Sequence, residues 1–282
     1  MKKIIRSIKE MQAFSESARK QGKTIAFVPT MGFLHDGHLH LIRQARTMGD
    51  FLIVSIFVNP IQFGPTEDFK QYPRDWDRDA HLCESGGADV IFAPTVEEMY
   101  PEGFQTNITV PHVSQNLCGL SRPTHFQGVA TVVAKLFNCT KPHVALFGEK
   151  DFQQLAVIKR MVLDLNVDIH IIGVPTVREA EGLAMSSRNT YLSTEERGSA
   201  LSLSNALFKV RELFHDGERN ARVLIDTAQA IITIEEGTTI DYIKVCDTET
   251  LQDVAIISKP AVMALAVKIG KARLIDNVVL KE

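Results

Sequence analysis

Residues 51–58, Phe-Leu-Ile-Val-Ser-Ile-Phe-Val, form a nearly unbroken apolar run that strongly constrains the fold of this chain. An apolar run of strand length, without polar alternation, is typical of a central parallel strand that is covered on both faces. Other strand-like runs occur at 24–28, 88–93, 143–147 and 168–174, and helical periodicity separates most of them. Strands that alternate with helices predict an α/β fold with a doubly wound, Rossmann-like parallel sheet.

The pattern changes after Pro175. Two segments with helical periodicity, 194–214 and 218–234, precede two strand-like segments, 239–245 and 261–267. Helices followed by strands predict a second, smaller α+β domain. We therefore expect a Rossmann-like domain over residues 1–175 and an α+β C-terminal domain over residues 176–282.

Two weaker patterns lie in the first of these domains. Apolar residues at helical spacing predict a helix over 4–21. Alternating residues over 105–110 predict an exposed strand.

The strand at 24–28 leads into a turn that carries two histidines. A helix is expected to begin near Gly37, and His35 and His38 lie on either side of that glycine. A helix start offers unpaired N–H groups and the positive end of a dipole, and two imidazoles add further donors. The turn therefore predicts a phosphate site. The alternative is that both histidines only cap or cross-link the turn.

Two amide side chains follow the central strand. Asn59 and Gln62 lie in a loop with Pro60 at the end of the 51–58 run. Amides offer donors to a carboxylate, and both donors and acceptors to hydroxyl groups, so this pair can hold a small hydroxy acid. The alternative, which sequence alone leaves equally open, is ordinary turn chemistry beside the proline.

Two further loops carry charged groups. Lys150 and Asp151 follow the strand at 143–147, where a lysine can neutralise phosphate and an aspartate can cap a helix or hold ribose hydroxyls. The segment Met185-Ser-Ser-Arg-Asn189 offers two hydroxyls and an arginine that can bind an oxyanion bidentately. The alternatives are a solvated Lys–Asp pair and an ordinary polar loop.

Charge and cysteine content limit the function classes. The chain has 31 Lys and Arg against 34 Asp and Glu, a net charge of −3, which gives no support for a nucleic-acid partner. No apolar run approaches the roughly 18 residues of a membrane span, so no membrane association is expected. The 4 cysteines are scattered, without a Cys-x-x-Cys pair. Free thiols in a reducing compartment are expected, which favours a cytoplasmic location.

The motifs in combination resemble the pantothenate synthetase family, a branch of the His-x-Gly-His nucleotidyltransferase superfamily. The resemblance spans essentially the whole chain and rests on six segments: Met-Gly-x-Leu-His-x-Gly-His (31–38), Ser-Ile-Phe-Val-Asn-Pro-x-Gln-Phe (55–63), Ser-Arg-Pro-x-His-Phe-x-Gly-Val (121–129), Phe-Gly-Glu-Lys-Asp-Phe-Gln-Gln-Leu (147–155), Met-Ser-Ser-Arg-Asn (185–189) and, near the C-terminal end, Arg-Leu-Ile-Asp-Asn (273–277). It implies an ATP-dependent ligase that condenses pantoate with β-alanine. The implied intermediate is a pantoyl adenylate, and the by-products are AMP and pyrophosphate.

The resemblance also implies roles for individual residues. His38 would be the catalytic proton donor, and His35, Lys150 and Arg188 would be further catalytic residues. The implied substrate-binding residues for pantoate and β-alanine are Asn59, Gln62 and Gln154. The implied ATP site consists of Pro29, Thr30, Met31, Gly32, Phe33, Leu34, His35, Asp36, Gly37, His38, Gly148, Glu149, Lys150, Asp151, Val177, Met185, Ser186, Ser187 and Arg188.

Within the implied ATP site, Lys150 would contact phosphate, Asp151 the ribose, and the backbone of Val177 the adenine. The second domain would close over the active site. Mg²⁺ would bridge the ATP phosphates while keeping several waters, so no dedicated metal site in the protein is expected. A homodimer is implied by the resemblance alone.

Two rival functions remain to be weighed. One is a nucleotidylyltransferase that stops at adenylyl transfer, and the paired amides Gln62 and Gln154 argue against it. The other is a catalytically silent nucleotide-binding module, and the intact set of His, Lys and Arg side chains argues against that.

Overall fold

The computed structural model describes residues 3–65 and 67–282, and the chain forms two compact units. The first unit consists of residues up to Val110 together with Arg122–Glu149 and Val157–Pro175. The second unit consists of Pro111–Ser121, Lys150–Ala156 and Thr176–Glu282. Two short segments that precede Pro175 in the sequence therefore fold with the second unit.

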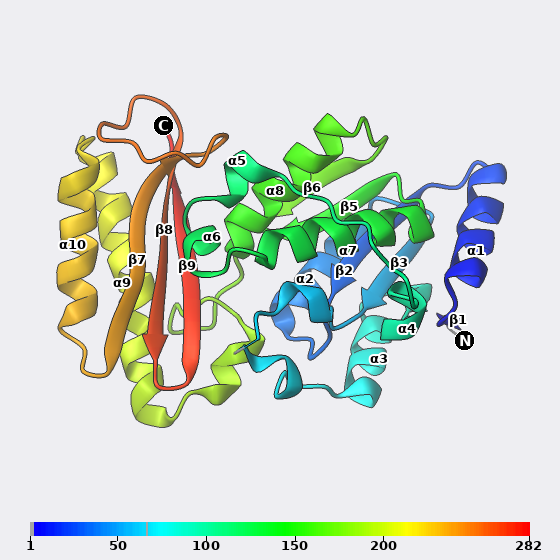
Figure 1. Ribbon diagram of the computed structural model, residues 1–282. Helices are drawn as coiled ribbons and strands as arrows, with labels where there is room; N and C mark the ends of the chain where they lie inside the picture. Colours follow the sequence, from blue (N-terminus) through cyan, green and yellow to red (C-terminus); the bar gives the residue numbers. More distant parts are fainter. Residues whose placement is uncertain (1–2, 66) are drawn as a thin grey trace. The chain divides into compact units, whose positions relative to one another are not determined.

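The first unit is built on a parallel sheet of six strands, in the order β1-β4-β3-β2-β5-β6 (Figure 1). The strands are β1 (Lys3–Ile5), β2 (Ile25–Thr30), β3 (Phe51–Ile56), β4 (Val90–Phe92), β5 (Val144–Gly148) and β6 (His170–Val174). The predicted doubly wound sheet is confirmed. Because β2 lies between β3 and β5, the strand order reverses at β2, and ligands of such sheets bind outside the carboxyl ends of the strands at that reversal.

Helices cover both faces of this sheet. The longer ones in the first unit are α1 (Ile8–Lys20), α2 (Asp36–Arg46), α3 (Trp76–Ser85) and α7 (His125–Thr140). On one face, Val28 of β2 packs in a core cluster with Ile42 of α2. On the other face, the ring of Phe27 meets that of Phe137 in α7, with 6.3 Å between centroids. Successive residues of a strand point to opposite faces, so burial on both sides explains the apolar runs.

Two local predictions were wrong. The predicted helix over 4–21 is divided, because Lys3–Ile5 pairs with β4 and the helix begins only after Ser7, whose hydroxyl caps it by accepting from the Glu10 N–H. The predicted strand over 105–110 has no ladder partner in the part of the chain that the structure describes. There the Ile108 N–H donates to the Thr131 hydroxyl of α7 at 2.9 Å, so a side chain replaces the neighbouring strand.

The second unit contains an antiparallel sheet of three strands in the order β7-β8-β9, with two long helices. Its main elements are α9 (Thr194–His215), α10 (Ala221–Thr233), β7 (Thr238–Asp247), β8 (Ala261–Ile269) and β9 (Ala272–Leu280). Ser193 and Glu196 form a capping box that starts α9. Apolar residues of both helices and all three strands share one core cluster, so the unit buries its own apolar surface.

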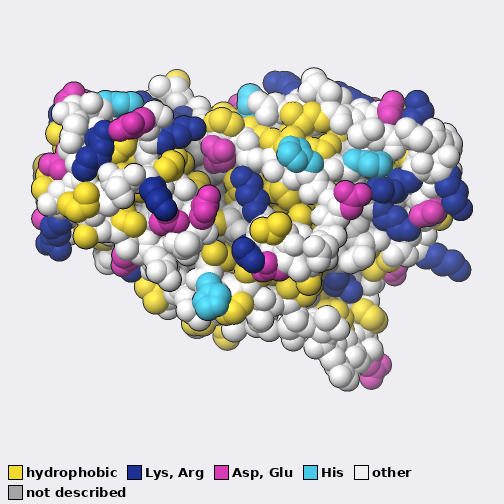
Figure 2. Space-filling model, turned by 90° about the horizontal axis from the view of Figure 1, so that it is seen from above, with side chains coloured by type: hydrophobic (Ala, Val, Ile, Leu, Met, Phe, Trp, Pro, Cys, Tyr) yellow, Lys and Arg dark blue, Asp and Glu magenta, His cyan; other side chains and the backbone are white. Residues whose placement is uncertain are grey.

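The remaining elements are short, apart from α8 (Phe152–Asp164), which runs from one unit into the other. Short helices are α4 (Val96–Met99), α5 (Pro111–Ser114) and α6 (Cys118–Ser121), and single 3-10 turns occur at Pro60–Gln62, Asp68–Lys70, Glu149–Asp151 and Ser187–Tyr191. All four cysteines are free and buried. Within the described ranges, no helix has both the length and the apolar character that crossing a membrane requires. Basic and acidic side chains are interspersed over the face shown in Figure 2.

His143 links the start of two neighbouring strands and makes the first unit sensitive to pH. Its Nδ1 accepts from the Ile25 N–H at 2.9 Å, which requires an unprotonated Nδ1. Burial, followed by the charge of Arg19, lowers the pKa of His143 below its usual 6.5. The unfolded chain therefore takes up a proton before the folded one does, and the free energy of unfolding falls as pH drops below about 6.5.

We predict that His143→Asn removes part of this pH dependence. Denaturant titrations at several pH values between about 5 and 7.5 will measure the free energy of unfolding of both proteins. The wild type should lose more stability toward low pH than the variant. His170→Asn, which replaces an exposed histidine of β6, should keep the wild-type slope. Equal slopes for wild type and His143→Asn would contradict the prediction.

Candidate active site

The two-histidine turn lies between β2 and α2. Gly32 and Phe33 both adopt left-handed backbone, with φ of +82° and +49°, so the chain turns sharply there. The His35 N–H donates to Nδ1 of His38 at 3.2 Å, and the two rings are 4.0 Å apart. A neutral imidazole that accepts at Nδ1 carries its proton on Nε2, so the geometry makes His38 Nε2 a hydrogen-bond donor.

A buried carboxylate holds this turn in place. Asp79 of α3 accepts from the Phe33 N–H at 2.6 Å and from the Leu34 N–H at 2.7 Å, and it is only 2% exposed. A Cβ added to Gly32 would come within 2.9 Å of an Asp79 carboxylate oxygen. Burial raises the pKa of Asp79, while the two backbone donors act in the opposite direction. The carboxylate therefore fixes the backbone that presents the histidines.

The two amides at the end of β3 are held by each other and by α7. Asn59 is 1% exposed and Gln62 is 8% exposed. Asn59 Nδ2 donates to Gln62 Oε1 at 3.0 Å and to the Gly128 carbonyl at 3.1 Å, and it does not cap the 3-10 turn that follows. Gln62 Nε2 donates to the Met31 sulfur at 3.1 Å. The first unit thus brings the amide pair against the histidine turn.

The carboxyl ends of three adjacent strands carry most of the predicted residues of the first unit. Pro29 and Thr30 end β2, and Thr30 links it to β3 by donating to the Ser55 carbonyl at 2.8 Å. Gly148 ends β5, the other neighbour of β2, and Glu149 follows it. Asp36 and Gly37 open α2. Residues 29–38, both amides and residues 148–149 therefore lie along one edge of one sheet.

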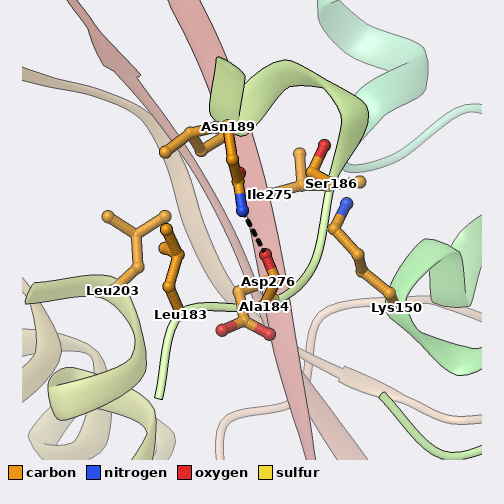
Figure 3. Close-up of a pocket in the computed structure, with 9 residues that line it drawn as sticks. Lys150, Leu183, Ala184, Ser186, Asn189, Leu203, Ile275 and Asp276 are labelled. Atoms are coloured by element: carbon orange, nitrogen blue, oxygen red, sulfur yellow. Dashed lines mark hydrogen bonds between the residues drawn. The ribbon is translucent and has the colours of Figure 1, made fainter. Parts of the chain in front are cut away.

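Two predicted residues of the second unit, Lys150 and Ser186, line a small cavity. Figure 3 shows the amine end of Lys150 pointing toward Ser186. The cavity is lined by Lys150, Leu183, Ala184, Ser186, Asn189, Leu203, Leu274, Ile275 and Asp276. Ser187 and Arg188 continue the same loop, in which the Arg188 N–H donates to the Ser186 hydroxyl at 3.2 Å. Asp151 is exposed and Gln154 is partly buried, so the structure does not place these two in the cavity.

Val177 and Met185 are paired through the backbone. The Met185 N–H donates to the Val177 carbonyl at 3.0 Å, and the next residues in each segment, Arg178 and Ala184, form an isolated antiparallel bridge. The two segments thus lie side by side as a narrow loop. The Val177 carbonyl keeps a second lone pair, which an additional donor can use.

Three residues to which the sequence analysis assigned no individual role support the loop and the lysine. Asp276 of β9, only 2% exposed, accepts from both terminal nitrogens of Arg178 at 2.6 and 3.0 Å. Its neighbour Asn277 donates to the Lys150 carbonyl at 2.9 Å. The signal available in the sequence was Asp276 itself, a charged residue among apolar residues. Such a residue is seldom buried without a partner.

Asn189, the third of these residues, secures the other side of the loop. Its Nδ2 donates to the Ala184 carbonyl at 3.1 Å, drawn as the dashed line in Figure 3, and to Glu179 at 2.8 Å. Glu179 in turn forms an ion pair with Arg197 of α9. Among the described residues, no group of three or more His, Cys, Asp or Glu side chains is arranged to hold a metal ion.

Comparison with known proteins gives a consistent result. A family model described as Pantoate-beta-alanine ligase matches residues 3–279. The chain is 59% identical over 280 residues to a pantothenate synthetase of Geobacter sulfurreducens, with 99% of each chain covered. It is 58% identical over 280 residues to a pantothenate synthetase of Syntrophus aciditrophicus, with 99% of this chain and 98% of the relative covered.

Two solved structures are similar over their whole length. Pantothenate synthetase from Thermus thermophilus superimposes with a TM-score of 0.94 at 43% identity, covering 99% of this chain and 100% of that one. A pantoate-beta-alanine ligase from Francisella tularensis, complexed with beta-gamma ATP and beta-alanine, gives a TM-score of 0.82 at 35% identity. In that comparison 100% of this chain and 99% of the other are covered.

The two bonds to Asp79 lead to a stability prediction. Asp79→Ala removes the acceptor of two backbone N–H donors, and losing such a bond in a buried place costs about 1–3 kcal/mol, so we expect the free energy of unfolding to fall by roughly 2–6 kcal/mol. Denaturant titration at neutral pH will measure this. Asp77→Ala removes an exposed carboxylate from the same helix and is the matched control. A change in Asp79→Ala no larger than in the control would contradict the prediction.

Proposed function

The chain belongs to the pantoate-beta-alanine ligase family, and from this premise we propose how its residues condense pantoate with β-alanine at the expense of ATP. One observation carries the assignment: the histidine turn at the end of β2 and the paired amides at the end of β3 contact each other through Met31 and Gln62. A donor-rich turn suited to phosphate and an amide suited to a hydroxy acid thus share one edge of the sheet.

The reaction needs an activated acyl group, because a carboxylate has no adequate leaving group. In the first step, a carboxylate oxygen of pantoate attacks the α-phosphorus of ATP, and the bond from that phosphorus to pyrophosphate breaks. In the second step, the β-alanine amine attacks the acyl carbon, AMP leaves, and the amine loses a proton. No side chain forms a covalent bond, so catalysis depends on positioning and on stabilising the charge that develops on phosphate.

In the first unit, we assign the phosphate-directed chemistry to the histidine turn. His38 acts as the proton donor through its Nε2, the ring position left carrying hydrogen when Nδ1 accepts from the His35 N–H. His35 lies 4.0 Å away, ring to ring, and adds a second imidazole to the same environment. The backbone of residues 29–38 and of Gly148 and Glu149 provides the remaining surface for ATP.

In the second unit, we assign charge neutralisation to Lys150 and Arg188, with donors from Ser186 and Ser187. The hydrogen bond from Asn277 to the Lys150 carbonyl supports this role, because it fixes the backbone from which the lysine extends. Asp151, which is exposed, is assigned to the ribose hydroxyls. The backbones of Val177 and Met185 are assigned to the adenine end of the nucleotide.

We assign pantoate to Asn59, Gln62 and Gln154, with Gln62 also beside β-alanine. The near-complete burial of Asn59 and Gln62 supports recognition of hydroxyl groups, because a buried amide left unpaired by a poor substrate is costly.

ATP is proposed to bind together with Mg²⁺, which would supply positive charge against the phosphates when bound. Mg²⁺ commonly takes its ligands from substrate phosphates and water rather than from a dedicated site in the protein. A cytoplasmic location is proposed and is supported by four free cysteines. A homodimer is proposed on the family resemblance, and no nucleic-acid partner is proposed.

The adenylate mechanism predicts partial reaction without the amine. Protein, ATP, Mg²⁺, pantoate and labelled pyrophosphate should give label in ATP in the absence of β-alanine, because the first step is complete and reversible before the amine is needed. Omitting pantoate is the control and should abolish exchange. Exchange that requires β-alanine would overturn the stepwise mechanism. Exchange without formation of an amide product once β-alanine is added would favour the rival nucleotidylyltransferase.

Lys150→Ala tests the assignment of charge neutralisation. Removing one group that stabilises a developing anion typically costs about 10²–10³ in rate, and we expect kcat to fall by that amount. The matched control is Lys159→Ala, which removes an exposed lysine from α8, and it should keep wild-type turnover. Steady-state kinetics and thermal unfolding will be measured for both. A normal kcat for Lys150→Ala would contradict the assignment and would favour the alternative, a solvated pair of Lys150 and Asp151.

A further inference from the structure

A third side chain, Tyr100, is linked to the amide pair described above. Tyr100 follows α4, in the loop beyond the end of β4, and its hydroxyl lies 2.7 Å from Asn59 Oδ1. Strand β4 is the neighbour of β3, so the tyrosine reaches across the edge of the sheet to the amides. Its ring packs against Phe57 and Phe104, with centroids 6.2 and 5.0 Å away, so packing fixes its position.

The chemistry of the partners fixes which way each amide faces. The Gly128 carbonyl can only accept, so the atom of Asn59 that faces it must be the NH₂ group. That NH₂ group also faces Gln62, so the Gln62 atom nearest to it must be the oxygen. Asn59 Oδ1 then points to Tyr100, whose hydroxyl must donate. Burial raises the pKa of Tyr100 well above its usual value, which keeps that hydroxyl protonated.

One donor group remains at the end of this chain of hydrogen bonds. Because Oε1 of Gln62 is turned toward Asn59, the Nε2 group is the part of the amide that faces away from Asn59, and its partner in the protein is the Met31 thioether, a weak acceptor. An amide that can rotate freely presents either a donor or an acceptor. An amide whose oxygen is held by Asn59 keeps its donor end turned away from Asn59.

We propose that Tyr100 is a positioning residue for substrate selection: by locking Asn59, it makes Gln62 present its NH₂ group to a hydroxyl or carboxylate oxygen of pantoate. This proposal rests on the assignment of Gln62 to pantoate under the proposed function. Gly128 is the second anchor, since a Cβ at that position would come within 2.4 Å of the Ile61 carbonyl and 2.6 Å of Gln62 Cα. The amide pair is thus held from the ends of two strands and from α7.

The experiment compares pantoate with its 2-deoxy and 4-deoxy analogues in wild type, Tyr100→Phe, Gln62→Ala and a control. Tyr242→Phe is the matched control, because it also removes a partly buried tyrosine hydroxyl with a protein partner, here the Cys118 sulfur at 3.6 Å. For each protein, kcat/KM is measured with pantoate and with each analogue, together with KM for ATP and the unfolding temperature.

We expect Tyr100→Phe to raise KM for pantoate by about five- to tenfold, the size of one hydrogen bond, with KM for ATP unchanged. The ratio of kcat/KM between pantoate and at least one deoxy analogue should fall by a similar factor. A merely structural loss would lower activity on all three substrates equally and would leave the ratio unchanged. Tyr242→Phe should keep the wild-type ratio of kcat/KM between pantoate and each deoxy analogue, and the wild-type KM for pantoate.

The outcomes separate the two proposals. If Gln62→Ala reduces the ratio of kcat/KM between pantoate and its deoxy analogues and Tyr100→Phe does not, the positioning role of Tyr100 is overturned. The assignment of Gln62 to pantoate then stands. If Gln62→Ala also leaves the ratio unchanged, the assignment of Gln62 to pantoate fails. A wild-type protein that forms no amide from pantoate and β-alanine would overturn the proposed function itself.

Discussion

The site depends on one constraint: polar groups removed from water need partners within the protein. Asp79, Asn59, Gln62 and Asp276 are each at least nine-tenths buried, and each accepts or donates hydrogen bonds at normal distances. An unpaired buried group would cost about 1–3 kcal/mol, a large fraction of the net stability of a protein. Because each partner is also fixed in direction, satisfying this constraint gives each of these side chains a defined orientation.

Sequence patterns predicted those features of the site that depend on residues close together in the sequence. Most of the apolar run at 51–58 forms the buried strand β3, and His35 and His38 lie at the N-cap and in the first turn of α2, because both features depend on neighbours within a few residues. The supporting contacts are not local. Asp79 bonds to Phe33 and Leu34 across 46 and 45 residues, and no periodicity or turn rule relates such positions.

The same reason explains why β9 was not predicted as a strand and why Asp276, which lies in the segment 273–277, was assigned no role. Ala272–Leu280 contains two charged residues and an asparagine, which weakens its appearance as a strand. Asp276 is tolerated there because Arg178, 98 residues earlier in the sequence, pairs with it and the Asn277 N–H donates to it. The fold class could therefore be read from periodicity, and candidate residues from motifs. The partners that orient those residues required the tertiary structure.

The two units differ in the kind of group they contribute to the proposed mechanism. The first contributes the two imidazoles and the amides of Asn59 and Gln62, and the second contributes the cations Lys150 and Arg188 together with the amide of Gln154. Attack of a carboxylate on a phosphate ester brings two anions together, so both kinds of group are needed. Cations lower the repulsion but discriminate weakly between anions, whereas a directed neutral donor discriminates by geometry without adding charge. Selectivity for pantoate is therefore expected to depend on the amide pair, and rate on the cations.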